Sequence, residues 1–119
     1  MVSIKSVLSP FRLDLSKREP IALRVELTND STETKLITFR LIVAKDLSVE
    51  STGISNSLEK RLGEIAPGKT YLKYFDIYPK VSTREKDYPA RMIIYEHYNE
   101  YEFVEREYKK DFIVKVMRT

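Results

Sequence analysis

The sequence predicts an all-β fold, an antiparallel two-sheet sandwich of about seven strands. In several segments apolar residues recur at every second position, which is the spacing of a strand with one face in a core. Turn-forming residues interrupt these segments at intervals of roughly eight to twelve residues, and helical periodicity is not sustained anywhere. The 119 residues, of which 42% are hydrophobic, suffice for one core, so we expect one domain over residues 1–119.

Three strand segments are predicted in the first half of the chain. Residues 4–15 alternate loosely and are interrupted by Pro10, which predicts an edge strand with a break because proline lacks a backbone donor. Residues 21–28 alternate cleanly and end in a polar turn, and residues 37–43 form the next strand.

The middle of the chain allows two interpretations. Residues 48–57 are rich in hydroxyl side chains and predict a loop. After it, Asn56 and Glu59 have the spacing of a capping box, which would open one helical turn that Gly63 closes. The alternative is a short strand over residues 60–65.

The last part of the chain predicts three more strands. A proline-glycine turn at 66–69 leads into a strand over 71–78. Residues 88–98 and 101–116 are the last two strands, joined by Asn99-Glu100 as a two-residue hairpin turn.

The predicted hairpin turn fixes which side chains face each other. Tyr98 would pair across from Tyr101, and His97 from Glu102. The final strand is long enough to need a bulge or bend near residues 109–111.

Composition excludes several functional classes. The chain has no cysteine, which rules out disulfides and thiol chemistry, and no apolar run approaches the roughly 20 residues of a membrane-spanning helix. The N-terminus has neither a basic leader nor a continuous apolar region, so we expect a cytoplasmic protein. Abundant Lys and Glu, together with the absence of Cys and Gln, favour a thermophilic source.

Charge is nearly balanced but unevenly distributed. The net charge of +3 is weaker than that of typical nucleic-acid-binding domains, so the charge disfavours a nucleic-acid partner. Residues 96–107 hold five glutamates against Arg106 alone, whereas residues 109–118 are mainly basic. Such segregation is typical of solvated sheet faces and is also found at docking surfaces.

Three stretches carry a resemblance to a known family. They are Leu23 to Asn29, Arg61 to Lys69 and Tyr88 to Tyr95. Together they resemble immunoglobulin-like domains of the CARDB type, which are found in archaea and bacteria, usually within larger secreted or surface chains. The resemblance implies an immunoglobulin-like sandwich. In contrast to those larger chains, we expect this one to be a stand-alone archaeal protein. It also implies that Tyr88 is a structural corner tyrosine, with a buried ring and a hydroxyl bonded to nearby backbone.

The sequence offers no constellation for catalysis, metals or cofactors. His97 is the only histidine, and its neighbour Glu96 points to the opposite face of a strand, so we expect an exposed strand histidine and no metal site. The glutamates of the last strand lie on an open ribbon without a cleft. Asn29-Asp30-Ser31 matches a glycosylation acceptor but is interpreted as a turn. We therefore expect a protein that is not an enzyme and has no cofactor.

Aromatic and acidic side chains concentrate at the last hairpin. Because strand alternation cannot bury both parities on one side, some of these rings must face outward. They have two interpretations, as cross-strand pairs that stabilise the hairpin or as a protein-binding surface. The candidate binding residues are Tyr95, His97, Tyr98, Glu100, Tyr101, Glu102 and Phe103.

The functional prediction is a non-catalytic protein-interaction or structural module that engages another protein through its last hairpin or an edge strand. The alternatives are a carbohydrate-binding module of a surface complex and, with less support, a single-stranded nucleic-acid binder. Because Pro10, Glu105 and Glu107 discourage open-ended edge pairing, we expect a monomer or a closed homodimer.

Overall fold

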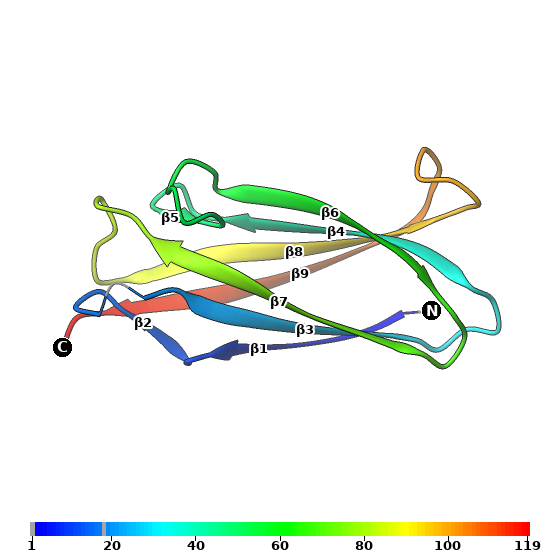
Figure 1. Ribbon diagram of the computed structural model, residues 1–119, viewed down its shortest axis with the longest axis horizontal. Coiled ribbons are helices and arrows are strands. Elements are labelled where there is room, and N and C mark those ends of the chain that lie inside the picture. Colours follow the sequence, from blue (N-terminus) through cyan, green and yellow to red (C-terminus); the bar gives the residue numbers. More distant parts are fainter. Residues whose placement is uncertain (1, 18) are drawn as a thin grey trace.

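The chain folds into two packed β-sheets (Figure 1). The computed structural model describes residues 2–17 and 19–119, and this part of the chain holds nine strands and no helix. None of it could therefore cross a membrane as a long apolar helix. The strands are β1 (Val2–Ser9), β2 (Arg12–Asp14), β3 (Ile21–Asn29), β4 (Lys35–Val43), β5 (Leu47–Ser48), β6 (Ser57–Ile65), β7 (Thr70–Pro79), β8 (Asp87–His97) and β9 (Val104–Met117).

The all-β prediction is confirmed, but the number of strands is larger than the seven expected. One sheet has the order β1-β3-β7-β5 and the other β2-β9-β8-β4-β6. Every pairing is antiparallel except that of β2 with β9, which is parallel. Alternate residues of both sheets point inward and form the core, where the rings of Phe39 and Phe75 stack across the sheets at 4.3 Å.

The extra strands arise where the sequence predicted a break and a loop. At Pro10 the chain leaves the first sheet, so β1 pairs with β3 whereas β2 pairs with β9 in the other sheet. The predicted break is confirmed, and it separates two strands rather than two halves of one. The two residues of β5, of which Ser48 is the first residue of the predicted loop, pair with the end of β7.

The helical turn considered after this loop is wrong, and the strand alternative is confirmed as β6. The Asn56 side chain does not cap a helix, because it donates a hydrogen bond of 3.1 Å to the Val43 carbonyl of β4. Gly63 has a φ of 83° and lies beside a register shift between β4 and β6, where a left-handed conformation favours glycine. The predicted turn at residues 66–69 closes through the Lys69 amide and the Ala66 carbonyl at 3.0 Å.

The last hairpin also differs from its prediction. β8 ends at His97 and β9 begins at Val104, so the connection is longer than the two residues expected. The β8–β9 register runs unbroken through residues 109–111, where we expected a bulge, and shifts instead between Glu96 and His97. Glu105 is left without a partner by this shift, and the bulge turns its side chain toward Lys35 of β4.

Candidate interaction site

The connection between β8 and β9, residues 98–103, is here called the tip. It closes through the Tyr98 amide, which donates to the Phe103 carbonyl at 2.8 Å, and the Phe103 amide, which donates to the Glu100 carbonyl at 3.1 Å. Asn99 takes a left-handed φ of 61°, which asparagine tolerates better than most residues. The predicted cross-strand pairs of Tyr98 with Tyr101 and of His97 with Glu102 are therefore wrong, and His97 pairs with Val104.

Two of the aromatic side chains at the tip are turned to solvent. Tyr98 is 62% exposed and Phe103 is 57% exposed, and Val104 continues this apolar surface at 53%. Glu100 and Glu102 are exposed beside them. Exposed rings with carboxylates around them therefore form the outer surface of the tip.

A third aromatic residue, Tyr101, folds back and holds the tip on the sheet. Its hydroxyl accepts a hydrogen bond from the Gly63 amide of β6 at 3.1 Å. Its ring meets the imidazole of His97 edge-on, with centroids 5.1 Å apart, and the Arg61 guanidinium lies 4.5 Å from the ring centroid. Tyr101 therefore links the tip to both β6 and β8.

The expectation that His97 is exposed is wrong. His97 is only 7% exposed, because Tyr101 and the beginning of β9 cover the face of the sheet on which it lies. The Nε2 atom shares a hydrogen bond of 2.7 Å with the Thr38 hydroxyl, and the buried Nδ1 atom has no hydrogen-bond partner. Burial lowers the pKa of His97, and the charge of Arg61 lowers it further.

A small cavity lies beside His97 on the same face. Its volume is about 170 Å³, and Tyr95, which is half-buried, forms part of its wall. Of the seven predicted binding residues, Tyr95, His97 and Tyr101 are thus turned toward the sheet, whereas Tyr98, Glu100, Glu102 and Phe103 are accessible. The full lining of the cavity is Thr38, Glu59, Arg61, Tyr95, His97, Tyr101 and Val104.

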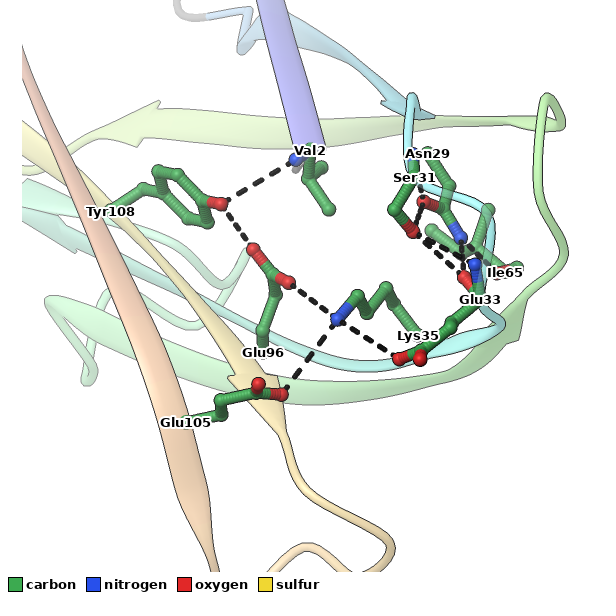
Figure 2. Close-up of polar contacts among 9 residues, drawn as sticks. All are labelled: Val2, Asn29, Ser31, Glu33, Lys35, Ile65, Glu96, Glu105 and Tyr108. Carbon is green, nitrogen blue, oxygen red and sulfur yellow. Dashed lines mark hydrogen bonds and ion pairs between the residues drawn. The ribbon is translucent and has the colours of Figure 1, made fainter.

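The other face of the same strand end carries a buried polar cluster (Figure 2). Glu96, which the sequence placed among the exposed acids, is 2% exposed. Its carboxylate accepts a hydrogen bond from the Tyr108 hydroxyl and lies 3.6 Å from the Lys35 ammonium. The Tyr108 hydroxyl also accepts a hydrogen bond of 3.4 Å from the Val2 amide of β1, which joins the two sheets. Burial raises the pKa of Tyr108, and the hydrogen bond to Glu96 raises it further.

Two further carboxylates lie near the Lys35 ammonium. It lies 3.7 Å from Glu105 and 4.0 Å from Glu33, both of which are much more exposed than Glu96. Because neighbouring strand residues point to opposite faces, Glu96 and His97 anchor the base of the tip from both sides of the sheet. Sequence reasoning missed this cluster, although the inward parity of Lys35 and Glu96 on their strands was its one available signal.

Two further residues singled out in the sequence, Tyr88 and Asn29, have buried side chains that bond to nearby backbone. Tyr88 is 2% exposed, and its hydroxyl donates to the Arg84 carbonyl at 3.1 Å and accepts from the Arg84 amide at 2.9 Å, the arrangement expected of a corner tyrosine. Asn29 is fully buried, and its side chain donates to the carbonyls of Glu33 at 2.8 Å and Ile65 at 2.7 Å. Its amide nitrogen is thus engaged inside the turn, as the turn interpretation requires.

Within residues 2–17 and 19–119 no group of three or more His, Asp or Glu side chains is arranged to hold a metal ion. No protein-family model matches the sequence, and no curated protein is recognisably similar to it. Among solved structures, 54 chains match the fold. One is the crystal structure of FixG-related protein from Vibrio parahaemolyticus, which is 12% identical, has a TM-score of 0.58 and aligns over 96% of each chain. At this identity the likeness concerns the fold alone.

Proposed function

We propose that this chain is a non-catalytic interaction module that binds another protein through the tip. One observation carries the proposal: the tip turns Tyr98 and Phe103 outward while Tyr101 fastens it to β6. Covering exposed rings with a partner removes apolar surface from water, which is favourable. A fastened loop has already lost much of its conformational entropy, so ordering it on binding costs less. Both features favour the bound state of a complex.

Charge indicates the kind of partner. Glu100, Glu102 and Glu107 are exposed on the tip and the adjoining part of β9, where Arg106 is the one basic residue among them. A basic protein surface would be attracted by this field, which raises association rates and fixes the orientation of the complex.

The distribution of other exposed rings supports a protein partner over a carbohydrate. Among the described residues, Phe11 and Tyr74 are also strongly exposed, but Phe11 precedes β2 and Tyr74 lies on β7, away from the tip. The exposed rings therefore do not align as the planar strip that sugar rings stack on.

The proposal also includes the immunoglobulin-like, CARDB-type assignment of the fold. Two packed sheets and a corner tyrosine at the start of β8 support it. Such domains host many functions, so this assignment adds nothing to the identity of the partner.

The test is capture of partners from a lysate of the source organism, followed by binding measurements with each purified partner. We expect the double substitution Tyr98→Ala and Phe103→Ala to weaken binding at least tenfold, which is about 1.4 kcal/mol. The matched control is Phe11→Ala with Tyr74→Ala, which removes two equally exposed rings elsewhere and should leave binding unchanged. Equal effects of the two double variants would refute the tip as the binding site.

A second measurement tests the electrostatic part. Reversing charge at Glu100 and Glu102 should slow association of the partner, and the difference should shrink as salt rises, because exposed charges are screened over about 8 to 10 Å. A loss of binding that is independent of salt would contradict steering by these carboxylates.

A further inference from the structure

The single histidine of the chain lies where the tip meets the sheet. His97 is covered by Tyr101, whose half-buried ring is the lid over the imidazole. The groups that face it from the packed elements are Thr38 of β4, Glu59 and Arg61 of β6, Tyr95 of β8, Tyr101 and the Phe103 carbonyl of the tip, and Val104 of β9.

The hydrogen bonds of His97 suit a neutral ring. A neutral imidazole donates from one nitrogen and accepts at the other, whereas the protonated ring donates from both. Nε2 has the Thr38 hydroxyl as its partner, but Nδ1 is buried and has none. A proton on Nδ1 would therefore place a cation in a buried site beside the Arg61 guanidinium, without a formed hydrogen bond in the present arrangement. The Tyr101 and Phe103 carbonyls and the Glu59 carboxylate raise the pKa of His97, but burial and the charge of Arg61 outweigh them, so the pKa is lowered.

The least costly way to hydrate Nδ1 is to lift the tip. Thr38 and Tyr95 belong to β4 and β8, which pair along eight residue positions at the centre of the sheet. Among the described side-chain interactions, Tyr101 is held by the Gly63 amide, the Arg61 guanidinium and its edge-on contact with the His97 ring. Local opening takes place where few contacts must break.

We propose that protonation of His97 releases Tyr101 from β6 and frees the tip, so that acidification switches the binding surface. As a means of regulating binding, this switch rests on the proposed function of the tip. The release itself is a property of the isolated protein and is measured without a partner.

The direction in which pH shifts the equilibrium between the fastened and the released tip follows from proton binding in the two states. The fastened state disfavours the proton, so the pKa of His97 is lower there than in the released state, where it approaches its ordinary value of about 6.5. The fastened state therefore has its full stability relative to the released state above about pH 6.5. This stability decreases as pH falls from that value to the lowered pKa of the fastened state. One proton changes the ratio of the two states by at most tenfold per pH unit.

The experiment is an NMR titration of the isotope-labelled full chain from pH 7.5 to 5.0. One histidine gives one imidazole to follow, and most Asp and Glu side chains titrate near pH 4 or below. We expect an imidazole midpoint below 6.5, and we expect the Gly63 amide and the amides of residues 98–103 to shift with that same midpoint. The hydrogen-exchange protection of the Gly63 amide, corrected for the intrinsic pH dependence, should fall several-fold over this range.

Two variants distinguish the proposed switch from a non-specific loosening of the structure at low pH. His97→Phe keeps a ring beneath Tyr101 but cannot titrate, so Gly63 protection should become independent of pH. Tyr101→Phe removes the hydroxyl that accepts from Gly63, so this amide should be poorly protected at every pH. Should His97→Phe fail to fold, the parent titration decides the question by itself.

The proposal is overturned by an imidazole midpoint at or above 6.5, or by tip and Gly63 amides that do not follow the imidazole. The Tyr98→Ala, Phe103→Ala variant should keep the transition, since neither ring is part of the lid. A failed binding test with an intact transition would therefore refute the proposed function and leave the switch standing.

Discussion

The buried ion pair of Lys35 and Glu96 should stabilise the protein far more than an exposed pair of the same geometry. The Lys35 ammonium lies 3.6 Å from the Glu96 carboxylate, with side chains 13% and 2% exposed. The exposed control is Arg24 with Glu26 on β3, at 3.5 Å and with side chains 40% and 28% exposed. The two distances are almost equal, so the pairs differ in burial and in the further partners of Lys35 and Glu96.

The magnitudes follow from the surroundings of each pair. With an effective dielectric constant of about 20, two charges 3.6 Å apart attract by about 4 to 5 kcal/mol. The substitution Lys35→Met forfeits this attraction and leaves the Glu96 charge buried, so we expect the free energy of unfolding to fall by about 3 to 5 kcal/mol. For Arg24→Met we expect about 0 to 1 kcal/mol, because water screens the exposed pair.

The assay is urea denaturation at low salt, since guanidinium chloride would itself screen the charges. Adding Glu96→Gln to Lys35→Met should recover most of the loss, because it removes the unpaired charge and keeps a carbonyl for the Tyr108 hydroxyl. Similar losses for Lys35→Met and Arg24→Met would refute the reasoning, as would a double variant no more stable than Lys35→Met.

Two further substitutions test the structural turns. Tyr88→Phe removes both hydrogen bonds to the Arg84 backbone and should lower the free energy of unfolding by about 1 to 3 kcal/mol, and a variant that melts like the parent would contradict the corner role. Asn29→Ala strips partners from the buried Ile65 carbonyl and from the Ser31 amide, and should cost about 2 kcal/mol or more in urea denaturation. A loss below about 0.5 kcal/mol would show that water replaces the Asn29 side chain.

The fold class could be predicted because strand alternation is a local signal. Residues 21–28 and 37–43 alternate in sequence and lie in β3 and β4 with their apolar parity in the core. The crossing at Pro10 could not be predicted, because proline marks a break in pairing but does not specify the sheet that the chain joins next. The parallel pairing of β2 with β9 is a long-range contact without a local pattern.

The sequence predicted where exposed aromatic residues lie, but not the surroundings of the other candidate residues. The aromatic cluster identified the last hairpin, and Tyr98 and Phe103 are exposed there. The length of the connection decided the rest: a two-residue turn would set Tyr101 across from Tyr98, whereas the longer tip folds Tyr101 onto β6. The packing of Tyr101 onto β6 buries His97. It could not be predicted locally, because Gly63, the hydrogen-bond partner of Tyr101, is 38 residues away from it in the sequence.

The two anchors at the base of the tip differ in chemistry, and this difference separates their effects. On the inner face, the ion pair of Lys35 and Glu96 lies between the sheets and is tied to β1 through Tyr108, so its loss should weaken the whole fold. On the outer face, His97 is covered by Tyr101 of the tip, so its protonation should free the tip while the sheets stay paired.

A measurement of both variants at pH 7.5 tests this separation. Lys35→Met should lower the urea midpoint and leave Gly63 protection close to that of the parent, because the contacts between Tyr101 and Gly63 are untouched. Tyr101→Phe should do the reverse, with loss of Gly63 protection and a urea midpoint close to that of the parent. If Tyr101→Phe lowered global stability as much as Lys35→Met, the tip would be part of the cooperative core, and a tip that cannot open separately could not act as a switch.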